Sequence, residues 1–375
     1  MSETRSRIGI LLPDLRGGGV ERIRLVLAHE FLRMGHAPEF VLMQPRGELL
    51  EEAEAAFPVH DLGCTRMRQL PFALARHLRR HRPDTLLAAM WPLTGAAGIA
   101  GRLARYSGRI VGSEHVDFRA TPSRRLFERL ALKHCGRLFY APCDRIIAVS
   151  SGVAESLSEA AALPRERVTV IHNPVRPFRS EEMTAEERQQ LSGWLNGQSS
   201  IIAIGTLKRQ KRFDVLIRAL AKVRQRLDAR LLILGEGSLR GELERLAAEL
   251  GIAGSVWLPG FKANPGTFLQ HSNAFVLSSD YEGFGNVVVE ALSAGVPVVS
   301  TDCPSGPAEI LSDGRYGALV PVDDHLALAD AIVRTIVNPI RADLLIKRSR
   351  DFSPRRQARQ YLQIMLSDSG ASKSY

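Results

Sequence analysis

The chain has 375 residues, of which 45% are hydrophobic, and its formal net charge is +10. A single hydrophobic core rarely grows to that length, so length and composition predict two domains, each with a substantial core. No segment approaches the roughly 20 uninterrupted apolar residues of a membrane-spanning helix, and the polar N-terminus lacks the apolar region of a signal peptide. We expect a cytoplasmic protein.

Four cysteines, Cys64, Cys135, Cys143 and Cys303, are scattered along the chain without a Cys-x-x-Cys pair. This pattern is typical of reduced cysteines that pack in the interior of a cytoplasmic protein. A zinc site at Cys135, Cys143 and His134 is disfavoured, because their spacing matches no usual zinc pattern. We therefore expect no metal site.

The positive charge is concentrated in residues 66–137, which contain 15 basic and 4 acidic residues. Such a region predicts an anionic partner, and the few aromatic residues and the lack of a nucleic-acid motif favour a membrane over nucleic acid. Segment 123–133 has apolar residues at helical spacing, with Arg124 and Arg125 on other faces. It is either an interfacial helix on the inner face of the cell membrane or a surface helix that packs on its own domain.

In the first half of the chain, short apolar runs alternate with amphipathic segments, which predicts a parallel sheet covered by helices on both faces. Strands are expected at Ile8–Leu12, Glu39–Met43, Val59–Asp61, Thr85–Met90, Arg109–Ser113, Arg145–Val149 and Val168–Ile171. Helices are expected at Val20–Met34, Gln69–His81, Thr94–Arg105 and Ser151–Glu159.

The loop after the first strand contains Gly17, Gly18 and Gly19. Glycines let the backbone approach a phosphate or a sugar closely, so this loop predicts ligand contact. A dinucleotide-binding fingerprint is excluded, because Arg22 occupies the position of its third glycine and the next strand ends at Gln44, which is not acidic. A nicotinamide or flavin enzyme is therefore not indicated.

His115 follows the fifth predicted strand, in the run Gly112–Asp117. A histidine in such a loop can bind a sugar or assist an acceptor hydroxyl, although a local structural role is the common alternative. His172, beside Asn173 and Pro174, lies where the alternation ends and is interpreted as structural.

A second alternation follows a charged stretch, Arg179–Gln190, so the first domain is expected to cover residues 1–175 and the second 176–353. The last helix, Pro354–Leu366, is expected to return to the first domain with residues 354–375. In the second half, strands are expected at Ser200–Gly205, Arg230–Leu234, Ser255–Leu258, Ala274–Leu277, Val296–Thr301 and Gly317–Val320, and helices at Phe213–Leu227, Ser238–Leu250, Asn286–Ala294 and His325–Asn338. The fold class is α/β, with two doubly wound domains facing each other across a cleft that receives the loops after the strands.

The loop after the first strand of the second domain begins at Gly205 and contains four cations: Lys208, Arg209, Lys211 and Arg212. Fixed cations stabilise the negative charge that a leaving diphosphate develops. Not all four side chains can point to a ligand, and we expect Lys211 first and Arg209 second.

Two further loops follow strands and contain turn residues. Glu236, between Gly235 and Gly237, is expected to face the ligand, and Phe261 or Lys262 is expected to lie beside a nucleobase. Simple turns are the alternative reading of both loops.

Glu282 and Glu290 are eight positions apart, the first in a loop and the second in the helix after it. The positions between them include a loop that leaves backbone amides accessible and a helix N-terminus that favours anions. Two acceptor carboxylates around an anion site fit a sugar nucleotide, which has hydroxyls at both ends and a diphosphate between them. The residues that we expect to line sugar and phosphates are Gly283, Phe284, Gly285, Asn286 and Val287.

Together with Ser113-Glu114-His115, His172–Val175 and Gly205–Lys211, this glutamate pair resembles the retaining GT-B glycosyltransferases of group 1, known as family 4. The resemblance covers nearly the whole chain. It implies that Glu290 binds the donor ribose, that Glu282 contacts the transferred sugar, and that a basic pair clamps the diphosphate. Lys211 matches one member of that pair, but Thr206 stands where the family has arginine, so Lys208 or Arg209 is the expected substitute.

The resemblance also implies front-face transfer with retention and without metal or other cofactor, and no Asp-x-Asp motif lies near the nucleotide loops. We therefore expect the enzyme to move a hexose or N-acetylhexosamine from a nucleotide sugar to a lipid-linked or cell-envelope glycan, as in polysaccharide or lipopolysaccharide biosynthesis. A UDP-sugar is favoured over a GDP-sugar as the donor. The alternatives are a nucleotide-sugar epimerase or hydrolase of the same fold, and a non-catalytic binding protein.

Overall fold

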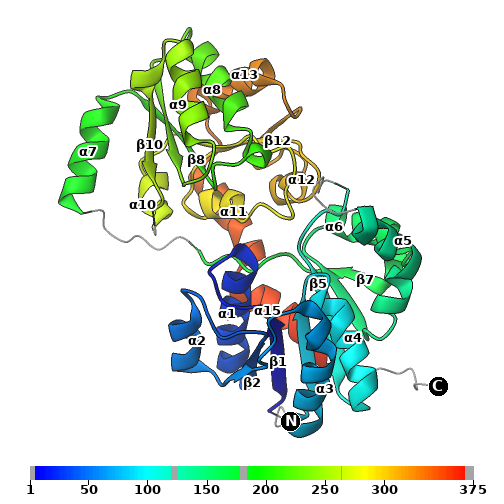
Figure 1. Cartoon of the computed structure of the whole chain (residues 1–375). Helices are drawn as coiled ribbons and strands as arrows, with labels where there is room; N and C mark the ends of the chain where they lie inside the picture. Colours follow the sequence, from blue (N-terminus) through cyan, green and yellow to red (C-terminus); the bar gives the residue numbers. More distant parts are fainter. Residues whose placement is uncertain (1–4, 120–125, 178–183, 263, 368–375) are drawn as a thin grey trace. The chain divides into compact units, whose positions relative to one another are not determined.

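The computed structural model describes residues 5–119, 126–177, 184–262 and 264–367, with side chains omitted for 126–131 (Figure 1). The described residues up to Pro174, together with those from Pro354 onward, form one compact unit, here called unit 1, and Val175–Ser353 form unit 2. Each unit is an α/β layer structure with one parallel sheet, which confirms the predicted fold class. In the described part of the chain, no helix is long and apolar enough to cross a membrane.

Unit 1 contains a seven-stranded sheet in the order β3-β2-β1-β4-β5-β6-β7. All of its pairings are parallel. The strand order reverses between β1 and β4, so the switch point of the sheet lies at the carboxyl ends of these two strands. The strands are β1 Arg7–Leu12, β2 Ala37–Leu42, β3 Val59–Asp61, β4 Thr85–Ala89, β5 Arg109–Glu114, β6 Arg145–Ala148 and β7 Val168–Val170.

The helices of unit 1 cover its sheet, and the C-terminal helix is one of them. Tyr361 and Met365 of that helix are buried in the same core as Ile23 and Phe31, and Thr85 donates a hydrogen bond to the carbonyl of Met365 at 3.2 Å. The longer helices are α1 Gly19–Arg33, α2 Leu50–Ala56, α3 Leu70–His81, α4 Leu93–Ala104, α5 Leu126–Tyr140, α6 Ser151–Ala161 and α15 Pro354–Leu366.

Unit 2 contains a six-stranded parallel sheet in the order β10-β9-β8-β11-β12-β13. Its order reverses between β8 and β11, so the loops after these two strands emerge at the switch point, where open α/β sheets bind ligands. The strands are β8 Ser199–Ile204, β9 Ala229–Leu234, β10 Val256–Gly260, β11 Ala274–Leu277, β12 Val298–Thr301 and β13 Ala318–Val320.

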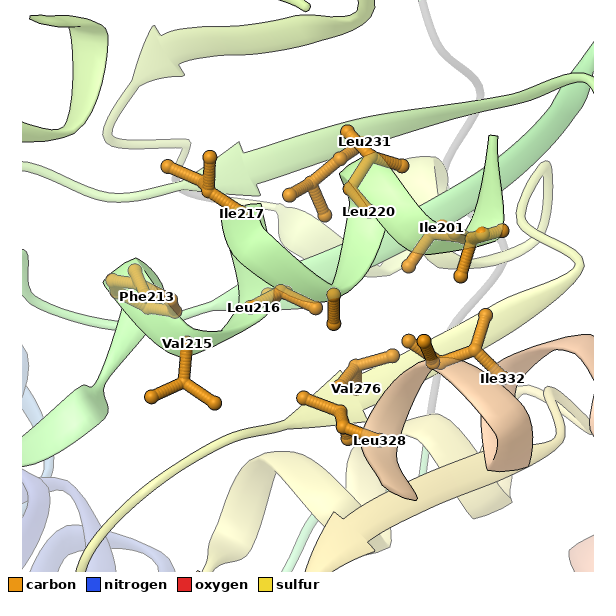
Figure 2. Packing of buried hydrophobic residues seen from close by; sticks show 14 of the residues in the cluster. Ile201, Phe213, Val215, Leu216, Ile217, Leu220, Leu231, Val276, Leu328 and Ile332 are labelled. Atoms are coloured by element: carbon orange, nitrogen blue, oxygen red, sulfur yellow. The ribbon is translucent and has the colours of Figure 1, made fainter. Parts of the chain in front are cut away.

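Apolar helix faces close the core of unit 2 against its sheet. Figure 2 shows Leu216 and Leu220 of one helix close to Leu328 and Ile332 of another, with Val276 of β11 beside them. The helices are α7 Ala185–Leu195, α8 Phe213–Val223, α9 Arg240–Glu249, α10 Pro265–Leu269, α11 Asn286–Ser293, α12 Pro307–Leu311, α13 His325–Val337 and α14 Ala342–Ser349.

The charged stretch Arg179–Gln190 contains the start of a helix that was not predicted, because α7 begins at Ala185. Thr184 caps this helix by accepting a hydrogen bond from the amide of Glu187 at 3.1 Å. The spacing Thr-x-x-Glu is a capping signal in itself. Helices α2, α10, α12 and α14 were also missed, since all four are short.

The carboxyl ends of β8, β9 and β10 are held together by backbone hydrogen bonds. The amide of Gly205 donates to Leu234 at 2.9 Å, and the amide of Gly235 donates to Gly260 at 2.9 Å. A Cβ atom at Gly235 would lie 2.0 Å from the carbonyl oxygen of Gly205, and φ of Gly235 is +148°. Only glycine therefore permits this approach of the two loops.

Replacing Gly235 with alanine should push the loop after β8 away from β9 and lower the free energy of unfolding by about 1–3 kcal/mol. Urea unfolding measures the loss. Gly241→Ala is the matched control, because a Cβ there meets nothing within 4 Å in α9, and alanine is the better helix former. Equal stabilities of the two variants would contradict the close approach.

Candidate active site

At the switch point of unit 2, an ion pair joins the loop after β8 to the loop after β11. Lys211 Nζ lies 2.6 Å from Glu282 Oε1. The hydroxyl of Ser279 donates to the same oxygen at 2.7 Å, and Thr301 Oγ1 in turn donates to the carbonyl of Ser279 at 2.7 Å. Glu282 Oε2 has no hydrogen-bond partner among the described residues, so this oxygen can accept a bond from a ligand hydroxyl.

Hydrogen bonds to backbone carbonyls fix these two loops to each other. The amide of Asp280 donates to the carbonyl of Gln210 at 2.9 Å, and Gln210 Nε2 donates to Tyr281 at 2.6 Å. Ser278 Oγ donates to the carbonyl of Lys211 at 2.7 Å. The ammonium and the carboxylate are therefore positioned by the frame of the sheet rather than by each other alone.

The four cations of the β8 loop divide into different roles. Arg212 pairs with Asp214 at 3.2 Å, with Asp280 at 2.9 Å and also with Asp323, so it braces the loop. Lys208 and Arg209 are exposed and form no ion pair with a residue of the described chain.

Although the residue as a whole is exposed, partial burial of the Lys208 ammonium, and then the charge of Lys211, lower the pKa of Lys208. The repulsion between the two ammonium groups indicates that Lys208 lies in the electrostatic neighbourhood of Lys211. Of the two candidates for the second phosphate ligand, Lys208 has this electrostatic signature beside Lys211.

The loop that leads to Glu290 ends in a glycine. Gly285 precedes α11 with φ +96°, a conformation that favours glycine, and the helix begins at Asn286. Glu290 lies in the second turn of α11 and is half-buried, while Phe284 is buried. The amides of the first turn thus lie between the positions of Glu282 and Glu290 in the chain, as the anion site requires.

Glu236 and Phe261 occupy the neighbouring loops after β9 and β10. Arg240 Nη2 lies 2.8 Å from Glu236 Oε1, and Arg240 Nη1 donates to the carbonyl of Leu258 at 2.9 Å. Arg240 therefore ties the loop after β9 to β10. The ring of Phe261 is 69% exposed, which leaves it accessible for stacking.

In unit 1, the predicted glycine loop follows β1 at the switch point. Arg22 donates through Nε to the carbonyl of Gly17 at 3.0 Å and pairs with Glu48 at 2.9 Å. The arginine that breaks the dinucleotide fingerprint thus anchors the loop. Gly18 precedes α1 and Gly19 is its first residue, and the space next to the Cα of Gly19 is open.

His115 contacts a buried arginine that the sequence analysis missed. Arg24 of α1 is fully buried, and its Nη2 lies 3.1 Å from His115 Nε2. The same Nη2 donates to Ser113 Oγ. No carboxylate of the described residues is within ion-pair distance of Arg24, and its Nε and Nη1 are buried without a partner.

This contact determines the form of His115. Burial, and then the charge of Arg24, lower the pKa of His115 well below 6.5, so the imidazole is neutral. Because a guanidinium can only donate, we assign Nε2 as the acceptor and the proton to Nδ1. Nδ1 is buried without a partner, so His115 has one hydrogen bond left to donate.

A sequence signal for Arg24 exists in retrospect. It occupies the first position of the stripe Arg24, Leu27, Ala28 and Phe31, whose other members are apolar and buried. A charged residue in the core-facing stripe of an amphipathic helix is uncommon and points to a specific role.

The proposed interfacial helix falls partly outside the described residues. Arg124 and Arg125 are among the residues that are not described, and α5 begins at Leu126. Membrane binding by this region stays a prediction.

Two family descriptions match the chain. Residues 17–179 match Glycosyltransferase Family 4, and residues 198–338 match Glycosyl transferases group 1. The chain is 26% identical over 330 residues to the N-acetylgalactosamine-N,N'-diacetylbacillosaminyl-diphospho-undecaprenol 4-alpha-N-acetylgalactosaminyltransferase of Campylobacter jejuni. The aligned residues cover 85% of this chain and 87% of the Campylobacter protein.

Two further proteins are similar along nearly their full length. The lipopolysaccharide core biosynthesis glycosyltransferase LpsE of Rhizobium meliloti is 27% identical over 362 residues, covering 94% of this chain and 97% of its own. The structure of Anabaena Alr3699/HepE with UDP and glucose superposes with a TM-score of 0.79 at 22% identity, covering 97% of this chain and 100% of that chain. The shared fold is GT-B.

The neutral state of His115 predicts a specific pH dependence of stability. Below pH 6.5 the unfolded chain binds a proton at this histidine that the folded chain excludes, so the free energy of unfolding falls as the pH falls. The loss is at most about 1.4 kcal/mol per pH unit. In urea unfolding, the wild type should lose about 1 kcal/mol more than His115→Gln between pH 7.5 and 5.5.

His134→Gln is the control for this measurement, because His134 is an exposed histidine of the same unit. Its pH dependence should follow that of the wild type. If the free energy of unfolding of His115→Gln has the same pH dependence as that of the wild type, the pKa of His115 is not lowered in the folded state.

Proposed function

Because the chain belongs to the group 1 glycosyltransferases of family 4 and is therefore a glycosyltransferase, we propose that it moves a hexose or N-acetylhexosamine from a UDP-sugar to a lipid-linked or cell-envelope glycan. In this proposal the anomeric configuration is retained, and neither a metal nor another cofactor takes part. The observation that carries it is the Lys211–Glu282 pair at the switch point of unit 2.

The ion pair suits a donor in which charge and hydroxyls are adjacent. A diphosphate bound beside Lys211 has its negative charge next to an ammonium that is already positioned. This ammonium stabilises the transition state, because the leaving phosphate gains negative charge there. Glu282 keeps its position through Ser279, and its Oε2 can accept a hydroxyl of the transferred sugar. Lys208 is our choice for the second phosphate contact, with Arg209 as the alternative.

The nucleoside lies at the other end of the donor in this proposal. Glu290 on α11 accepts hydrogen bonds from the ribose diol, and the exposed ring of Phe261 stacks beside the base. The N-terminus of α11 faces the phosphates between these two contacts. We favour UDP because the HepE structure, which shares the fold, contains UDP and glucose.

His115 has a binding role in this proposal rather than that of a general base. Its Nε2 is occupied by Arg24, so it cannot take a proton from an acceptor without losing that contact. Its Nδ1–H is buried, so in this proposal the residues that cover it move before it donates to a sugar oxygen. Deprotonation of the acceptor is then left to the departing phosphate, as retention by front-face attack requires.

The acceptor is proposed from the relatives. One is named as acting on a diphospho-undecaprenol-linked sugar and another as a lipopolysaccharide core enzyme. The basic composition of residues 66–137 agrees with an anionic, lipid-linked acceptor. We therefore propose that this enzyme works on the inner face of the cell membrane.

Glu290→Ala should weaken UDP binding about 10- to 100-fold in calorimetry, because hydrogen bonds to a charged group contribute about 1.5–3 kcal/mol. Glu242→Ala, which removes an exposed carboxylate of α9, should leave UDP affinity unchanged. Unaltered UDP affinity in Glu290→Ala would rule out the ribose contact.

Lys211→Met should lower kcat/KM by about 100- to 1,000-fold in a donor-plus-acceptor assay, because it removes a fixed charge from the leaving group. Lys208→Met and Arg209→Met, compared in the same assay, identify the second phosphate ligand as the variant with the larger loss. A Lys211→Met enzyme with wild-type kcat/KM would refute the role of the pair.

The reaction itself is tested by incubating the enzyme with a UDP-sugar, with and without an undecaprenyl-diphosphate-linked sugar, and analysing products by mass and proton NMR. Transfer should require the acceptor, retain the anomeric configuration of the donor, and persist in excess EDTA. Conversion of the donor without acceptor would indicate the epimerase or hydrolase, and inversion or loss of transfer in EDTA would contradict the mechanism.

A further inference from the structure

Three histidines of unit 1 converge away from the glycine loop and His115. His60 lies in β3, while His77 and His81 lie four positions apart on α3 and therefore on one face of that helix. One potential ligand atom from each lies within 4.8 Å of the other two. The ring centroids of His77 and His81 are 4.4 Å apart, and those of His60 and His81 are 4.5 Å apart.

A buried carboxylate borders this cluster. Glu39 of β2 is 5% exposed, and its Oε2 lies 3.4 Å from His60 Nε2. Glu39 Oε1 and His77 Nε2 are both buried without a hydrogen-bond partner. Each such atom costs about 1–3 kcal/mol when it is left unpaired, so two of them in one cluster point to a ligand that both can bind.

We propose that His60, His77, His81 and Glu39 form a binding site for a divalent transition metal of the zinc type. All four ligands come from the protein, which is the pattern of a structural site rather than a catalytic one. The metal would tie the edge strand β3 and its neighbour β2 to α3. This site departs from the expectation of no metal, and it is independent of the proposed glycosyl transfer.

The geometry requires a modest adjustment. Tetrahedral zinc with Zn–N bonds of about 2.0–2.1 Å holds its ligand nitrogens about 3.3 Å apart. The imidazoles must therefore approach one another by on the order of 1 Å, and Glu39, which lies outside the group of ligand atoms within 4.8 Å of one another, must move further. Rotation about the side-chain bonds provides these movements. His60 and His81 are only half-buried, so the metal has a path of entry.

The protonation of the cluster agrees with metal binding. Burial, followed by the charges of His81 and His60, lowers the pKa of His77 to about 4. The pKa of His81 is also lowered, first by burial and then by His60. Neutral imidazoles are the form that coordinates metals, so binding at neutral pH displaces few protons.

Arg7 is the one cation of the described residues that contacts the cluster. Its Nη2 lies 3.1 Å from Glu39 Oε2, and its Nη1 donates to the carbonyl of His81 at 2.6 Å. Arg7 and His60 thus both contact Oε2, which leaves Oε1, the atom without a partner, for the metal.

The test uses the full chain, freed of any affinity tag and stripped with a chelator, and then titrated with Zn²⁺ alone. We expect one zinc per chain and a rise in Tm, because a ligand of the folded state stabilises it. Co²⁺ in place of Zn²⁺ should give the visible absorption of a tetrahedral site. His60→Ala and His81→Ala should each weaken Zn²⁺ binding at least tenfold.

His134→Ala is the matched control, since it removes an exposed histidine of unit 1 outside the cluster and should bind zinc like the wild type. Far-UV circular dichroism of the metal-free variants establishes that they fold, and Glu39→Gln replaces any variant that does not. The proposal is overturned if the wild type takes up no zinc, or if zinc affinity is the same in His60→Ala, His81→Ala and the control.

Discussion

The contact between Lys211 and Glu282 joins the loops after β8 and β11 at the switch point of unit 2. Their side chains are 14% and 10% exposed, so both charges have lost most of their water. Removing charges from water costs free energy that a single ion pair often fails to recover. Such a pair is therefore weak evidence for stability, and its position at the switch point of the sheet agrees with the ligand binding proposed above.

Neighbouring residues hold Glu282 in place and keep Arg212 in other ion pairs. The hydroxyl of Ser279 donates to Glu282, and Thr301 Oγ1 holds the backbone carbonyl of Ser279. Arg212 pairs with three aspartates instead of with Glu282. Neighbouring cations in one loop thus have separate tasks. Arg24 of unit 1 differs from Arg212, because it is buried beside a hydroxyl and an imidazole instead of pairing with a carboxylate.

Much of this organisation could be predicted from the sequence. Alternating apolar runs and amphipathic segments predict both parallel sheets, and the long helices α1, α3 and α15 begin and end within one or two residues of the prediction. The GT-B fold and the glycosyltransferase family are confirmed by the comparisons. Regular periodicity over many residues is the strongest signal that a single sequence contains.

What the sequence could not provide was the partner of each side chain. Lys211 was expected at the ligand, but its pairing with Glu282 joins residues that are 71 positions apart. The isolation of Arg24 from carboxylates, and the convergence of His60 with α3, likewise depend on strand order. Short helices such as α12 were missed because a few residues contain too little periodicity to be recognised.

The position of α15 has a consequence for how the chain is made. Unit 1 includes residues before Pro174 and after Pro354, with all of unit 2 between them. Because Tyr361 and Met365 fill its core, unit 1 cannot complete its packing on the ribosome until unit 2 has been synthesised. Until then, the apolar face of α1 that α15 covers is exposed to solvent or bound by a chaperone.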